Sequence, residues 1–122
     1  YKQVSNFLID GSTKYLKENN FDYKILYAPG SFEIPFLISK NIDLYFGFIA
    51  LGCIIRGDTY HFEIISNQCA RKIMDLSISS TKPIGFGILT CENIEQALVR
   101  SDPSKKNKGR EAALACTKLI CS

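Results

Sequence analysis

The residues best suited to chemistry gather in one short stretch, residues 52–61. It contains the only histidine of the chain, His61, together with one arginine, one aspartate and two glycines. An imidazole exchanges protons near neutral pH and is the side chain most often used in general acid–base catalysis. A loop that leads into a helix also presents free backbone N–H groups at the positive end of the helix, which favours an anion. The stretch indicates proton transfer beside a bound anion; a capping or core histidine is the alternative role of His61.

Two further segments are expected to lie near this stretch. Residues 29–33 follow one β-rich run, and residues 90–92 follow another. Ligands of open α/β sheets bind outside the carboxyl ends of the strands, where the three segments would meet. The sequence therefore predicts a site built from three loops.

The sequence lacks the residues that metal sites and nucleotide-cofactor sites usually need. The five cysteines form no C-x-x-C pair, and one histidine cannot complete a standard zinc spacing, so we expect no metal. Residues 85–87 lack the third glycine of a dinucleotide loop, and no phosphate-binding P-loop motif occurs, so we expect no cofactor. An odd number of cysteines favours free thiols in a reducing compartment, the cytoplasm or, in a eukaryote, a plastid.

Length and composition restrict the partners. The chain has 122 residues, 46% hydrophobic and 22% charged, with a formal charge of +3. These values fit a single domain over residues 1–122. No apolar run reaches the ~18 residues of a membrane helix, and the charge is too small to require nucleic acid. The basic run 105–110 has no interleaved aromatic residues, which favours a solvated loop or one lysine beside an anion over nucleic-acid binding.

Helical and strand periods alternate along the chain. The predicted helices cover residues 4–18, 31–40, 61–80, 90–100 and a segment after Gly109, with Ser31 and Thr90 as caps. The predicted strands cover residues 24–28, 45–51 and 84–89. This order predicts a three-layer α/β/α sandwich around a parallel sheet. Three strands are few for five helices, and a further strand before Tyr1 would balance them.

Four motifs in the same order resemble the 6,7-dimethyl-8-ribityllumazine synthase family of riboflavin biosynthesis. Residues 28–35 resemble its P-G-[AS]-[FY]-E-[IL]-P turn, and residues 50–63 resemble its L-G-x-[VI]-I-[RK]-G-x-T-x-H-[FY] loop. Residues 86–97 are similar to its F-G-[VI]-[LV]-T…E-Q-A stretch, and residues 107–113 to its N-K-G-x-[ED]-A-A segment. The resemblance implies a flavodoxin-like fold. It also implies condensation of 5-amino-6-(D-ribitylamino)uracil with 3,4-dihydroxy-2-butanone 4-phosphate, without metal or organic cofactor.

The resemblance also implies roles for individual residues. His61 would transfer protons, and Arg100 would bind the phosphate together with the Asp58-Thr59 turn. The remaining substrate-binding residues would be Ser31, Phe32, Glu33, Cys53, Ile54, Ile55, Phe86 and Lys108. Of these, Cys53, Ile54 and Ile55 would act through backbone groups, Phe86 would come from a neighbouring subunit, and Lys108 would assist near the phosphate.

The resemblance also implies an assembly, and two alternative functions remain beside the condensation. Sites between subunits imply a homo-oligomer, either a pentamer or a larger shell of pentamers, with small molecules as the other partners. The family's first strand and a substrate-stacking aromatic residue would precede Tyr1. A non-catalytic flavin- or lumazine-binding shell module and a riboflavin-synthase-type enzyme that condenses two lumazines are the alternatives. Retention of His61, Arg100 and Lys108 together favours the enzyme.

Overall fold

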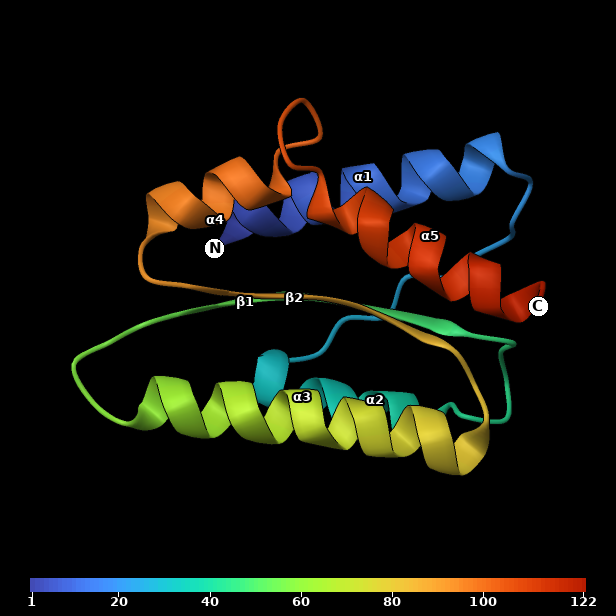
Figure 1. The fold of residues 1–122 in the computed structure, drawn as a ribbon, viewed down its shortest axis with the longest axis horizontal. Helices are drawn as coiled ribbons and strands as arrows, with labels where there is room; N and C mark the ends of the chain where they lie inside the picture. The colour runs from blue at the N-terminus through green and yellow to red at the C-terminus, as the bar shows by residue number, and fades with distance from the viewer.

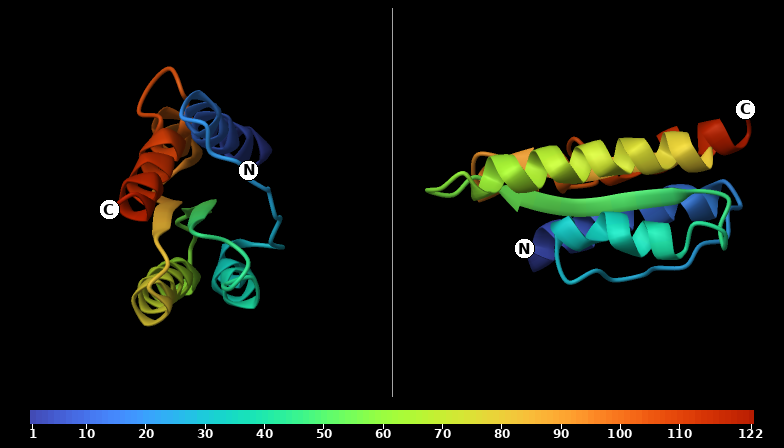
Figure 2. Two further views of the ribbon diagram at one scale, coloured as in Figure 1. Left: turned by 90° about the vertical axis from the view of Figure 1, so that its right-hand side faces the viewer. Right: turned by 90° about the horizontal axis from the view of Figure 1, so that it is seen from below.

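The computed structural model describes residues 1–122, with a two-stranded parallel sheet between two layers of helices (Figure 1). Its elements follow the order α1 (Lys2–Glu18), a 3-10 turn (Ser31–Glu33), α2 (Ile34–Lys40), β1 (Phe48–Ile55), α3 (His61–Ser80), β2 (Ile84–Cys91), α4 (Ile94–Ser101) and α5 (Lys108–Ile120). Seen end-on, α1, α4 and α5 cover one face of the sheet, and α2 and α3 cover the other (Figure 2). The predicted α/β/α layering is confirmed. No helix is both long and apolar enough to cross a bilayer.

The sheet sorts its side chains between the two helical layers. Strands β1 and β2 pair in parallel from Phe48 opposite Ile84 to Ile55 opposite Cys91. Because successive residues of a strand point to opposite faces, even and odd positions enter different cores. One core, on the α2/α3 side, contains Ile38, Ala50, Ile54, Cys69, Ile73 and Ile88. The other, on the α1/α4 side, contains Val4, Leu8, Leu89, Cys91 and Ala97.

Glycines allow α5 to lie directly on β2 and on α1. A Cβ atom at Gly85 would lie 2.0 Å from the carbonyl oxygen of Ala112, and one at Gly109 would lie 2.2 Å from that of Leu8. Both distances are far inside van der Waals contact, so any larger residue would force the backbones apart. Packing therefore explains the glycine at position 85 next to Phe86.

The predicted strand over residues 24–28 is absent. The sheet contains only β1 and β2, and residues 24–28 form no ladder with either strand. Ile25 and Leu26 remain about two-fifths exposed, at 41% and 40%. A β-rich run becomes a strand only when its backbone groups find a neighbouring strand. A prediction from composition alone therefore gives the sheet one strand too many.

Two predicted helix starts are also wrong. Ser31 caps no helix through its side chain; it begins the short 3-10 turn that leads into α2. Thr90 lies inside β2, which continues to Cys91. The cap of α4 is Asn93, whose side-chain oxygen accepts a 2.9 Å hydrogen bond from the Gln96 N–H. Asparagine is one of the preferred cap residues, so it competes with an earlier threonine.

Candidate functional site

The loop of residues 56–60 connects the carboxyl end of β1 to the first residue of α3, His61. Residues 56–61 are all exposed. The Thr59 hydroxyl oxygen accepts a 3.2 Å hydrogen bond from the backbone N–H of His61. Tyr60, the cap residue, makes no side-chain capping bond, so the start of α3 keeps donors for an external acceptor. This geometry places an accessible imidazole beside an end that favours anions.

Arg56 forms an ionic cluster at the base of this loop. Its Nε lies 3.0 and 2.9 Å from the two carboxylate oxygens of Glu92, and its Nη1 is paired with Glu63. The guanidinium carbon lies 4.5 Å from the centre of the Phe62 ring. The hydrogen bonds that Arg56 donates to Glu92 and then to Glu63 raise the pKa of Arg56. The pKa of Glu63 is lowered, first by a hydrogen bond from its own backbone N–H and then by Arg56.

The turn of residues 31–33 lies against the middle of β1. A Cβ atom at Gly52 would lie 2.8 Å from the Ser31 hydroxyl oxygen, so the turn approaches a glycine of the strand closely. The Cys69 thiol of α3 donates a 3.3 Å hydrogen bond to the Ser31 carbonyl oxygen. Phe32 is 54% exposed, whereas Glu33 is half-buried. The turn and α3 are therefore held on the same face of the sheet.

The three predicted lining residues of β1 do not share one face. Ile54 belongs to the core on the α2/α3 side, while Cys53 and Ile55 pack against the core on the α1/α4 side. Burial raises the pKa of the Cys53 thiol to about 11, with a further contribution from the neighbouring Cys91. A ligand outside the end of β1 would thus meet the backbone of this run more readily than its side chains.

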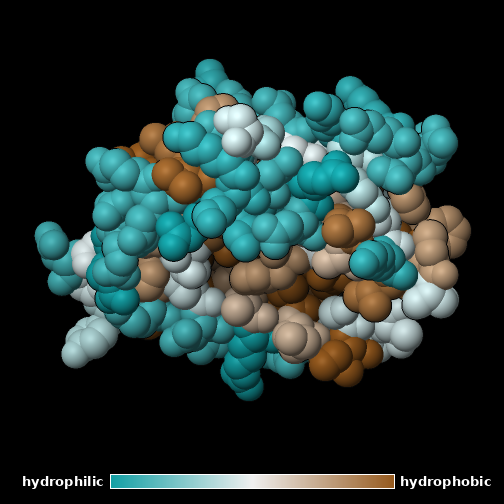
Figure 3. Space-filling model, turned by 45° about the horizontal axis from the view of Figure 1, so that its top comes forward, coloured by the Kyte–Doolittle hydropathy of each residue, from teal (hydrophilic) through white to brown (hydrophobic).

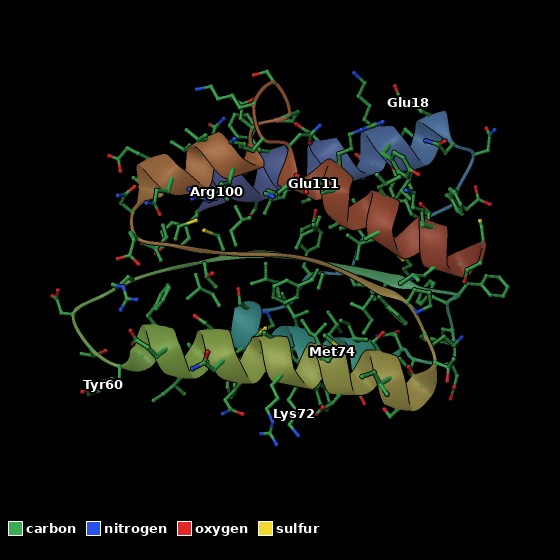
Figure 4. All side chains as sticks on the ribbon, viewed as in Figure 1. Glu18, Tyr60, Lys72, Met74, Arg100 and Glu111 are labelled. Atoms are coloured by element: carbon green, nitrogen blue, oxygen red, sulfur yellow. The ribbon has the colours of Figure 1, made fainter.

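The structure separates the remaining predicted residues. Phe86, 46% exposed, has the strand parity of Ile84 and Ile88, which places it on the α2/α3 face. Arg100 lies on α4, above the sheet, whereas Tyr60 lies below it at the start of α3 (Figure 4). Lys108 begins α5 and pairs with Glu111 at 3.3 Å. One chain therefore does not bring the two basic residues to His61.

Two surface hollows lie away from this site. One, of about 630 Å³, is lined by the end of α1 and residues 20–23. The other, of about 530 Å³, lies between the start of α1 and α4. Neither is lined by a residue predicted from the sequence to bind substrate. In a single chain, residues 56–61 of the candidate site lie exposed at the surface.

Sequence reasoning assigned no role to Arg56, Glu63 or Glu92. The signal that could have found them is the parallel register. Ile55 pairs with Cys91, so the next residues along the two strands, Arg56 and Glu92, emerge side by side. Opposite charges at neighbouring strand ends predict an ion pair once that register is known.

The fold and the loops define a class: a three-layer α/β protein whose candidate small-molecule site lies at the carboxyl ends of parallel strands. The model of the 6,7-dimethyl-8-ribityllumazine synthase family matches residues 1–122, and the chain belongs to this family.

Two bacterial relatives carry the same name as the family. The 6,7-dimethyl-8-ribityllumazine synthase of Zymomonas mobilis is 45% identical over 122 residues, covering 98% of this chain and 87% of the relative. The protein of that name from Agrobacterium fabrum is 43% identical over 127 residues, covering 98% of this chain and 86% of the relative. The resemblance inferred from the four motifs is therefore confirmed.

Proposed function

We propose that this chain condenses 5-amino-6-(D-ribitylamino)uracil with 3,4-dihydroxy-2-butanone 4-phosphate, giving 6,7-dimethyl-8-ribityllumazine, phosphate and two molecules of water. The observation that carries the proposal is the position of His61. It is an exposed imidazole at the first residue of a helix whose cap residue makes no side-chain hydrogen bond, just beyond the carboxyl end of β1. The match to the family along the whole chain supports the same reaction.

The proposed chemistry consists mainly of positioning and proton transfer. The amine of the uracil attacks the carbonyl carbon of the butanone, and water leaves as the carbon–nitrogen bond becomes an imine. Elimination of phosphate and tautomerisation then give a second carbonyl group, and the ribitylamino nitrogen attacks this carbonyl to close the ring with loss of a second water. His61 transfers protons in these steps, while the backbone N–H groups of Asp58 and Thr59 hold the phosphate. The 31–33 turn holds the ribitylamino-uracil, with Glu33 accepting hydrogen bonds from hydroxyl groups.

We propose that each site is shared between two chains of a homo-oligomer, a pentamer or a shell of pentamers. The separation of Arg100 and Lys108 from His61 supports this, because all three residues belong to one proposed site. In a ring of head-to-tail contacts, the α4/α5 side of one copy would meet the α3 start of the next.

We place the assembly in a reducing compartment, the cytoplasm. All five cysteines are free thiols, and the pairs needed for a disulfide framework are not formed. Small molecules are the proposed ligands, and neither nucleic acid nor a membrane is required.

The test is to mix both substrates with the purified protein and follow the absorbance and fluorescence of the lumazine product. Product formation that depends on both substrates is expected. Failure to form product, combined with tight binding of a lumazine or flavin, would instead identify a non-catalytic binding module. Disproportionation of two lumazines without the phosphorylated substrate would identify the riboflavin-synthase-type reaction.

Sharing of the site has its own test. Subunits with His61→Ala and subunits with Arg100→Ala are unfolded, mixed and refolded together. Random neighbours in a ring should give about a quarter of interfaces with both wild-type residues, so the mixture should exceed either parent. Mixed assemblies verified by native mass spectrometry, yet no more active than the parents, would contradict a shared site.

A further inference from the structure

The strongest unassigned feature is a cluster of four side chains at the base of the 56–60 loop, which we call the Arg56 clamp. It consists of Arg56, Phe62, Glu63 and Glu92. One guanidinium joins three separate segments: the end of β1, the end of β2 and the first turn of α3. The backbone contributes as well, because the Arg56 N–H donates a 2.9 Å bond to the Cys91 carbonyl oxygen.

The rest of the loop has little else to hold it. A Cβ atom at Gly57 would have no neighbour within 4 Å, and residues 57–60 are exposed. The side chains of residues 57–61 form no hydrogen bond to another part of the chain; the only one is the local bond from the His61 N–H to Thr59. Apart from the packing of Phe62 and Ile65 on the core, the clamp fixes where the first turn of α3 lies.

The geometry suits orientation better than stability. The side chains of Arg56, Glu63 and Glu92 are 43%, 38% and 57% exposed, and pairs exposed to this extent add little to the free energy of unfolding. An arginine whose planar fork engages two carboxylates nevertheless restricts the direction of both. Glu63 is two residues after His61 in the same helical turn, so restricting Glu63 also restricts the backbone from which the imidazole extends.

We propose that Arg56 is a positioning residue, which holds His61 and the Asp58-Thr59 amides at the productive distance from the 31–33 turn by binding Glu92 and Glu63 together. This inference rests on the proposed condensation, and it assigns no direct contact between Arg56 and either substrate. A displacement of about 1 Å at a reacting group costs up to about a hundredfold in rate, so an exposed clamp can matter for turnover.

The experiment compares Arg56→Gln, Glu92→Gln, their double variant and Arg56→Lys. We expect kcat of Arg56→Gln to fall about ten- to a hundredfold, with the KM for ribitylamino-uracil unchanged. Glu92→Gln should reproduce much of this loss, and the double variant should be no worse than Arg56→Gln because the two residues act as one unit. Arg56→Lys should recover only part of the activity, since a lysine cannot bridge both carboxylates.

Arg110→Gln is the matched control. Arg110 also pairs with a glutamate, Glu18 at 3.5 Å, and also stacks on an aromatic ring, that of Tyr15 at 5.0 Å. It lies on α5, its partners Glu18 and Tyr15 belong to α1 of the same chain, and no contact with substrate is proposed for it. We expect its kcat and KM to match those of the unaltered protein.

Amide hydrogen exchange tests the clamp without any substrate. Residues 64–66, whose amides donate the first hydrogen bonds of α3, should exchange faster in Arg56→Gln and Glu92→Gln than in the unaltered protein or in Arg110→Gln. Unchanged exchange and unchanged kcat would overturn the inference. A second result would also overturn the inference: kcat losses of Arg56→Gln and Glu92→Gln that add in the double variant, with a KM for the phosphorylated substrate raised in Arg56→Gln only. That result would make Arg56 a direct phosphate ligand. Absence of product from the unaltered protein would reject the proposed function instead. Amide hydrogen exchange alone would then show whether Arg56 holds the first turn of α3 in place.

Discussion

The two faces of the sheet differ in how completely they are covered. On the α1/α4/α5 face, Val4, Leu8 and Ala97 have no exposed surface. On the α2/α3 face, large apolar side chains remain in solvent, with Phe36 72% and Ile78 71% exposed. The outer surface of α1, α4 and α5 is mainly hydrophilic, and apolar residues gather below it toward the sheet (Figure 3).

This difference separates stability from function. The close-packed face contains the contacts that fix the fold, including the glycine-mediated packing of α5 on β2. The open face contains the 31–33 turn, Phe86 and His61, for which we propose contact with substrate. Apolar surface that a single chain leaves uncovered is typical of an interaction site, which agrees with the proposed assembly.

The largest expected effect is on catalysis at the open face. His61→Ala should lower kcat about 10²–10⁴-fold, because a general acid–base group is removed. The free energy of unfolding should change by less than about 0.5 kcal/mol, since His61 is exposed. Steady-state kinetics and urea unfolding measure the two quantities. Full activity across neutral pH would remove His61 from the mechanism.

The reverse pattern is expected at the close-packed face. Leu8→Ala should cost about 3 kcal/mol of unfolding free energy, because it opens a cavity at a side chain with 0% exposure. Leu44→Ala is the matched control; at 70% exposure it should cost less than about 0.5 kcal/mol. Equal losses in urea unfolding would show that the two regions do not differ as the structure indicates.

Thiol reactivity gives a finer comparison of buried and exposed positions. Cys121 is exposed, whereas Cys69, Cys91 and Cys116 are buried. Burial raises the pKa of Cys53 to about 11, so its thiolate is scarce at pH 8 and increases only as pH rises toward that value. A thiol reagent at pH 8 should show one fast phase, absent in Cys121→Ser. A fast phase that survives this substitution would contradict the described burial.

The smallest effect concerns the loop between α4 and α5. The Asp102 carboxylate accepts 2.9 and 2.8 Å hydrogen bonds from the N–H and hydroxyl of Ser104. These bonds lower the pKa of Asp102, backbone contribution first. A lowered pKa gives a contribution to stability that is present above the ordinary pKa and is lost as pH falls through the folded value. Asp102→Asn should thus be slightly less stable near neutral pH and should differ less in acid, as thermal unfolding at several pH values would show.

Local periodicity predicted the helices better than the sheet. Helix α3 was predicted over its full length, 61–80, because apolar residues recur at helical spacing. The β-rich run 24–28 was not a strand, because pairing depends on distant parts of the chain. For the same reason the ion pair of Arg56 with Glu92, 36 positions away, could not be found before the register was known.

The parallel register also makes β2 a segment of fixed length. At one end Gly85 faces the Ala112 carbonyl, and past the other end Glu92 meets Arg56. Removing one residue between them would turn the neighbouring side chains through half a turn and shorten the strand by about 3.3 Å. Depending on which residue is removed, either the Phe86 side chain would point at α5 or the Glu92 carboxylate would no longer reach the Arg56 guanidinium. Natural length variation in such chains should therefore occur in the turns, such as residues 102–107, while β2 keeps a constant number of residues.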